Sequence, residues 1–271
     1  MNKTVRRAGA LMVAGMLTVG LGACGDDDDE ADDDPGAVVG DESAAGDGED
    51  FCTAALAVDA ISLQMDTGEA TQEDLDAAIA AAVEAAPDEI ADAAETMATE
   101  TAAAAEAAAG APEGEGPPPM PGEAYYPASV EVGTYVADNC DVETLDITAT
   151  EYAFEGFAES VPAGTTVINF DNQGSEFHEV VVMQIAEGEE RPVEELLALP
   201  EEEAMSVVTN KAFVFGPPGA ATYVTADLDP GRYVAICFVP VGATPEAMET
   251  GAALDGEPHF LHGMVSEFEV A

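Results

Sequence analysis

Three residue types that bind soft metal ions gather near the C-terminal end of the sequence. Cys237 ends an apolar run, and His259 and Met264 follow after a long segment, with four residues between them. A thiolate, an imidazole and a thioether are soft to borderline ligands, and together they suit copper. His178, which lies earlier in the sequence, can supply a second imidazole. These four residues are therefore the candidate ligands of one copper ion.

The part of the sequence that carries these residues, 144–271, reads as a series of short strands. Leu145–Thr150 alternates between apolar and polar residues, which is typical of a half-buried strand. A turn followed by a strand is expected at 161–170, and further strands are expected at 177–185, 212–215, 221–226, 231–239 and 264–270. Glycine- and proline-rich turns separate them, a pattern that indicates an all-β sandwich. The acidic stretch Pro192–Met205 has helical character and predicts a helical insertion.

Two segments of this region resemble the two halves of a cupredoxin. The first segment consists of Val161–Thr165, Asn169–Gly174 and then His178. The second consists of Pro230–Tyr233 and then Cys237, His259 and Met264. The resemblance implies a Greek-key sandwich that holds one type 1 copper for one-electron transfer. The copper ligands that it implies are His178, Cys237, His259 and Met264. It favours His259 over His262 because the spacing from His259 to Met264 matches the family.

The sequence departs from the family pattern in two places. Twenty-one residues separate Cys237 from His259, whereas the family usually has a few. This loop, Phe238–Pro258, is expected to act as a cover or a partner surface, and its length does not prevent His259 from returning, because the entropy of loop closure grows slowly with length. The second departure is Glu179, where many members of the family have a small polar residue that ties the ligand loops together.

Residues 51–143 are rich in Ala, Glu and Asp, and their apolar residues recur near helical spacing. Helices are expected at 51–63, after the cap residue Thr71, from Pro87 to Ala109 and from Glu123 to Ala137. A proline in the first turn followed by acids, as at Pro87, is typical of a helix start. The sequence therefore predicts an α+β multidomain chain, with a small Ala-rich helical bundle at 51–143 and the cupredoxin-like sandwich at 144–271.

The four cysteines of the sequence divide into different roles. Cys52 opens the first helical segment and Cys140 lies at the end of the same region. Because disulfides persist outside the cytoplasm, these two are expected to pair and to staple the bundle. Cys237 is then left without a cysteine partner, which a copper site would explain.

The N-terminal residues 1–23 have the pattern of a signal peptide, with Lys3, Arg6 and Arg7 ahead of a short apolar run. Leu21–Cys24 resembles the lipobox of bacterial lipoproteins, which implies cleavage before Cys24 and a lipid on its sulfur. The acidic residues 24–50 are expected to form a disordered tether. The chain is therefore predicted to work outside the cytoplasm, anchored to the bacterial membrane through Cys24.

The chain is extremely acidic, with 56 Asp and Glu residues against 6 Lys and Arg residues and a formal net charge of −50. Such a surface repels nucleic acid and favours cationic partners, such as a redox protein with a basic face. It also repels itself unless salt screens the charges. We therefore expect the protein to work at high ionic strength, as in a halophile.

Three functions are compatible with the sequence. The first is one-electron transfer through a single type 1 copper, and the others are a metal-free cupredoxin-like module that binds a partner and a protein that stores or delivers copper. Scattered rather than clustered methionines argue mildly against storage. An enzyme is not expected, because multicopper enzymes need more His ligands than the three that the chain contains, and no catalytic triad or nucleotide-binding loop is recognisable.

Overall fold

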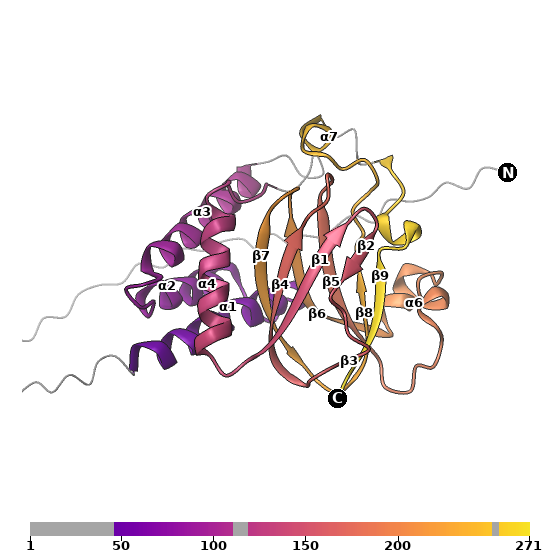
Figure 1. The fold of residues 1–271 in the computed structure, drawn as a ribbon, viewed down its shortest axis with the longest axis horizontal. Helices are drawn as coiled ribbons and strands as arrows, with labels where there is room; N and C mark the ends of the chain where they lie inside the picture. Colours follow the sequence, from indigo (N-terminus) through magenta and orange to yellow (C-terminus); the bar gives the residue numbers. More distant parts are fainter. Residues whose placement is uncertain (1–45, 111–118, 251–254) are drawn as a thin grey trace, which may run out of the picture.

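The structure, a computed structural model, describes residues 46–110, 119–250 and 255–271. Along these residues four long helices come first, and nine strands in two sheets follow (Figure 1). The predicted signal peptide, the lipidation residue Cys24 and most of the predicted tether lie outside the described residues. None of the described helices is long and apolar enough to cross a membrane.

The four N-terminal helices follow the predicted order. They are α1 (Gly46–Thr67), α2 (Gln72–Glu84), α3 (Ala91–Gly110) and α4 (Tyr125–Asn139). Thr71 caps α2 as predicted, because its hydroxyl oxygen accepts a hydrogen bond from the backbone N–H of Asp74, whose carboxylate accepts one from the N–H of Thr71. The predicted start of the third helix at Pro87 is wrong. The carbonyl of Pro87 accepts a hydrogen bond from the N–H of Ile90 in a tight turn, and α3 begins at Ala91.

The nine strands form the predicted sandwich of two sheets. The four-stranded sheet has the order β2-β1-β4-β7, formed by Ala153–Glu155, Glu143–Thr150, Gly164–Asn172 and Ala221–Leu228. The five-stranded sheet has the order β3-β9-β8-β5-β6, formed by Ser160–Val161, Val265–Val270, Gly231–Ile236, His178–Ile185 and Val208–Gly216. The pairs β1/β4 and β3/β9 are parallel, and the other pairs are antiparallel. Strands β2 and β3 were not predicted, because segments of three and two residues are too short to show an alternating pattern.

The predicted helical insertion consists of two short helices between β5 and β6. They are α5 (Val193–Leu196) and α6 (Glu201–Met205). Val193 and Leu196 are buried against Ile185 of β5 and Val234 of β8. The insertion therefore covers part of the five-stranded sheet, and Figure 1 shows α6 on the opposite side of the sandwich from α1–α4.

Helices α1 and α4 pack on the four-stranded sheet, and α2 and α3 pack against these two helices (Figure 1). Their buried cluster includes Phe51 and Val136 from the helices and Val167 from β4. Helix α4 comes so close to β7 that a Cβ on Gly133 would lie 2.7 Å from the ring of Tyr223. The helices thus share a core with the sheet, and the division into domains at 51–143 and 144–271 stays a prediction.

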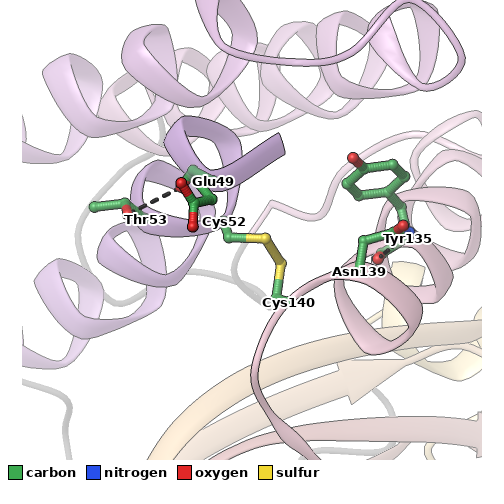
Figure 2. Close-up of a disulfide and its surroundings, with 6 residues drawn as sticks. All are labelled: Glu49, Cys52, Thr53, Tyr135, Asn139 and Cys140. Atoms are coloured by element: carbon green, nitrogen blue, oxygen red, sulfur yellow. Dashed lines mark hydrogen bonds between the residues drawn. A yellow bond between two sulfur atoms is a disulfide. The ribbon is translucent and has the colours of Figure 1, made fainter. Parts of the chain in front are cut away.

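The predicted disulfide between Cys52 and Cys140 is present. It links α1 to the residue that follows α4, as Figure 2 shows, over a sequence separation of 88 residues. Among the described residues, Cys237 is the free cysteine, and it is buried. The pairing predicted from the number and positions of the cysteines is therefore confirmed.

Candidate metal centre

Three of the four predicted ligands meet in a buried cluster at one end of the sandwich. One donor atom each from His178, Cys237 and His259 lies within 4.8 Å of the others. The two Nδ1 atoms of the histidines are 3.1 Å apart, and Sγ of Cys237 is 3.4 Å from Nδ1 of His259. All three side chains are fully buried. The lone pairs of two imidazoles and a sulfur thus converge on one small volume.

Strand pairing and a buried amide place His178. It is the first residue of β5, where it pairs with Gly216 of β6. The turn before it is held by Asn172, whose side-chain amide donates hydrogen bonds to the carbonyls of Glu176 and Gly216, both at 2.9 Å. The local sequence therefore fixes the entry of the chain into β5, and with it the position of the imidazole.

Cys237 and Met264 lie opposite each other where β8 and β9 meet the site. Cys237 follows the last residue of β8, and its N–H donates to the carbonyl of Met264 at 3.2 Å. The N–H of Met264 in turn donates to the carbonyl of His259 at 3.2 Å. Met264 is fully buried in the sandwich core beside the cluster. The backbone therefore brings the fourth predicted residue to the site, and ligation by its thioether stays a prediction.

The long loop after Cys237 returns as a paired structure. The N–H of His259 donates to the carbonyl of Val239 at 2.8 Å, and Pro240 and Pro258 form an isolated antiparallel bridge. The loop carries the short helix α7 (Pro245–Thr250), while residues 251–254 are outside the described part of the chain. Both ends of the loop are thus held together, and His259 enters the site from the 3₁₀ helix η2 (His259–His262).

His262 lies outside the cluster. Its side chain is 37% exposed, and Nε2 is 3.7 Å from a carboxylate oxygen of Glu257. The ring of Tyr152 packs near both histidines. Its centroid is 4.8 Å from that of His259 and 5.1 Å from that of His262. Of the two histidines of η2, His259 is therefore the one that faces the thiol.

Glu176, which the sequence analysis did not single out, orients His259. Its Oε2 atom lies 3.0 Å from Nε2 of His259 and also accepts a hydrogen bond from the N–H of Gly242 at 2.6 Å. Because a carboxylate only accepts hydrogen bonds, Nε2 carries the proton and Nδ1 is left free to bind a metal ion. The position of Glu176 two residues before His178 was a local signal, but its contact with His259 depends on how the long loop returns.

His178 fits closely against its surroundings on the side away from the cluster. Its Nε2 atom is buried without a hydrogen-bond partner among the described residues, and the nearest carboxylate oxygen, on Glu151, is 3.8 Å away. A Cβ on Gly174 would lie 2.7 Å from this nitrogen, so only a glycine leaves room for the ring. A metal ion on Nδ1 would place the ring proton on Nε2, toward Glu151, which fits the orphaned atom.

The ionisation states of the cluster also fit a metal ion. Burial lowers the pKa of His178 to about 4, with a further contribution from His259, and burial lowers the pKa of His259. Burial raises the pKa of the Cys237 thiol to about 12. Without metal the cluster therefore holds two neutral imidazoles and a neutral thiol. A cation in the site would favour the thiolate and displace its proton.

Glu179 links two of the ligand segments, a role that a small polar residue has at this position in many cupredoxins. Its Oε1 atom accepts a hydrogen bond from the N–H of Phe238 at 2.9 Å. This bond joins the residue after His178 to the residue after Cys237, so the carboxyl ties the two ligand segments together. Burial raises the pKa of Glu179 to about 7, and the hydrogen bond from Phe238 opposes this shift.

The likeness of this fold to solved structures is confined to about half of the chain. No protein-family model and no curated protein matches the sequence. Auracyanin from Roseiflexus castenholzii is 24% identical, with 47% of this chain and 96% of that chain covered and a TM-score of 0.31. Auracyanin A, a blue copper protein from Chloroflexus aurantiacus, is 21% identical, with 48% and 99% covered and a TM-score of 0.27.

Rusticyanin from Thiobacillus ferrooxidans is 17% identical, with 48% of this chain and 78% of that chain covered and a TM-score of 0.29. A multicopper oxidase also matches at 12% identity, with 48% of this chain and 44% of that chain covered and a TM-score of 0.25. These solved structures match the C-terminal half of the chain, and each is less than 25% identical to it. The assignment of the metal rests on the donor set itself, which fits one type 1 copper.

Proposed function

We propose that this chain binds one copper ion through His178, Cys237 and His259, with Met264 as a weak axial ligand, and that it transfers single electrons. The observation that carries the proposal is the buried cluster of two imidazoles and one thiol within 4.8 Å of one another. Two imidazoles, a thiolate and a long thioether contact form the donor set of blue copper sites. A copper ion bound there would supply reversible one-electron chemistry.

The surroundings of the cluster suit electron transfer because they hold the donor atoms in place. His178 and Cys237 adjoin strands of the same sheet, and His259 is held by backbone hydrogen bonds to Val239 and Met264. Ligands that cannot move far adapt little between two oxidation states, which keeps the reorganisation small. The burial of all three donors also excludes water from the site.

The acidic surface supports a cationic redox partner. The formal net charge of −50 gives an attractive field for a protein with a basic docking face at low salt. We further propose that a lipid on Cys24 anchors the chain to the outer side of a bacterial membrane, on the strength of its signal-like residues 1–23. Anchoring would confine the encounter with a partner to the membrane surface.

The visible absorption spectrum of the chain after addition of Cu(II) tests the copper proposal. We expect an intense thiolate-to-copper band that is lost in Cys237→Ala and in His259→Ala. His262→Ala is the matched control, since this histidine lies in the same short helix but outside the cluster, and it should keep the band. A colourless protein with a titratable thiol would refute the proposal and leave a metal-free binding module.

A second measurement separates electron transfer from copper storage or delivery. The coloured protein is reduced and reoxidised in the presence of a Cu(I) chelator. An electron-transfer protein should regain the full band over repeated cycles, because its buried ligands retain the ion. Transfer of the copper to the chelator within one cycle, seen as loss of the band, would favour copper delivery instead.

A further inference from the structure

A cavity lies between the helices and β7, on the opposite face of the four-stranded sheet from the sandwich core. Its volume is about 190 Å³. Its walls are mainly apolar and aromatic and include Phe51, Leu75, Ile79, Met97, Tyr125 and Tyr223. An apolar cavity of about 150 Å³ is large enough to hold a benzene molecule. The cavity is therefore the size of a small ring compound.

Asp59 of α1 is the one charged side chain among the described residues that line this cavity. Its Oδ2 atom accepts hydrogen bonds from the N–H of Thr225 at 2.8 Å and from the hydroxyl of Thr225 at 2.7 Å. Within the described part of the chain, no hydrogen bond to Oδ1 is formed. The carboxylate is thus held in a fixed orientation by one oxygen, while the other is available to a ligand.

No basic side chain of the described residues neutralises Asp59. Arg191, Lys211 and Arg232 form their ion pairs with other acids. Burial raises the pKa of Asp59 to about 6, and the hydrogen bonds from Thr225 oppose the shift. A carboxylate in a mostly apolar setting is unfavourable unless it is paired, so a bound cation would stabilise it.

Two tyrosines give the cavity aromatic walls. Tyr125 of α4 and Tyr223 of β7 both line it, and the ring of Tyr223 is wedged against Gly133 of α4. Aromatic faces attract organic cations. The same two tyrosines and Asp59 also line a neighbouring groove of about 550 Å³, which runs past the exposed Phe213. The groove gives a ligand a route to the carboxylate.

We propose that this cavity binds a small organic cation, a protonated amine on an apolar ring or short chain, with the ammonium group on Oδ1 of Asp59 and the apolar part between the helices. A metal ion such as Ca²⁺ fits poorly, because a single carboxylate cannot supply its usual six to eight oxygens. An anion would be repelled by Asp59 and by the acidic chain as a whole. The proposal does not rest on copper binding, because none of the residues that line the cavity belongs to the His178, Cys237 and His259 cluster.

The test compares benzylamine with benzyl alcohol, a neutral molecule of nearly the same shape, in calorimetric titrations of the full chain at high salt. High salt screens unspecific attraction of amines to the acidic surface. We expect benzylamine to bind one site at least about tenfold more tightly than the alcohol, because a hydrogen bond to a charged group is stronger than a neutral one. Asp59→Asn should abolish this difference, and Asp138→Asn, which removes an exposed acid of α4 outside the cavity, should keep it.

A second variant tests the cavity without touching the carboxylate. Ala98 of α3 lines the cavity, and Ala98→Met should fill part of it and block benzylamine while the far-UV circular dichroism stays unchanged. This variant decides the question if Asp59→Asn does not fold. Equal affinity for the amine and the alcohol, no detectable binding of benzylamine, or binding that survives Ala98→Met would each overturn the proposal.

Discussion

The replacement Glu176→Gln removes the negative charge beside His259 and can keep the hydrogen bond between the two side chains. The Oε2 atom of Glu176 lies 3.0 Å from Nε2 of His259, and its side chain is only 13% exposed. A glutamine can offer a carbonyl oxygen in the same place, so the imidazole should keep its orientation. The substitution therefore removes one negative charge beside the site with little change in shape.

The expected effect is a higher reduction potential of bound copper. The carboxylate is one imidazole ring away from the donor cluster, a charge separation of about 7 Å, which at an effective dielectric constant of about 20 corresponds to about 2 kcal/mol. For a one-electron couple this is about 100 mV. The sign is positive, because a nearby negative charge stabilises Cu(II) more than Cu(I), and its removal favours the reduced form.

A redox titration followed by the blue band measures this shift. Glu257→Gln is the matched control, since Glu257 lies near η2 but is 75% exposed and faces His262 instead of the cluster. Its removal should change the potential little, because solvent screens it. In the metal-free protein, nitrogen NMR should show the proton of His259 on Nε2 in the wild type and in Glu176→Gln. A shift of Glu176→Gln to lower potential, or one no larger than that of the control, would refute the reasoning.

Three other properties can be measured on the metal-free protein. Replacing both Cys52 and Cys140 by serine should lower the free energy of unfolding by up to about 4 kcal/mol, because the bridge closes a loop across 88 residues, and unchanged denaturant curves would contradict this. The pKa of Glu179 is raised from 4.5 to about 7, so its contribution to stability is fully present below about pH 4.5 and is lost as the pH rises through 7. The free energy of unfolding of Glu179→Gln should equal that of the wild type at pH 4 and exceed it at pH 8 by at most about 3 kcal/mol. If the two proteins have equal free energies of unfolding at both pH values, Glu179 is not a buried carboxyl. The melting temperature should rise with salt, because the net charge of −50 is otherwise unscreened, and a flat salt titration would count against a high-salt protein.

The fold and most of the cluster were predictable because their signals are local. Strands such as β1 and β4 show in the sequence as apolar runs or as runs in which apolar and polar residues alternate. Turns rich in glycine and proline separate these runs. The disulfide followed from the number of cysteines and their places at the two ends of the helical segment. Cys237 and His259 stood out because residues of these types are rare in this chain, which has three histidines in all.

The surroundings of the cluster were not predictable, because they depend on how distant segments meet. Glu176 is an ordinary acid in a chain with 56 of them, and its partner His259 lies 83 residues further on. The sequence pattern marked Glu179 as a departure from the family, and only the fold shows that it bonds to the N–H of Phe238. The cavity around Asp59 was hidden for a similar reason. Alanine-rich helices indicate close packing in the sequence, but the space left between the helices depends on the angles between their axes.

The Cys52–Cys140 bridge also determines how the protein would respond to mechanical force. A pull on the N-terminal end enters the described structure through α1 and can cross at once to Cys140, three residues before β1 begins. The covalent loop between the cysteines, which contains most of α1 and all of α2, α3 and α4, is then bypassed and bears no tension. Roughly 300 Å of contour length is hidden in this way, at about 3.5 Å for each of the 88 residues. Under oxidising conditions the force would act directly on the strands of the sandwich. Reduction of the disulfide would allow the helical segment to unfold and extend under the same force.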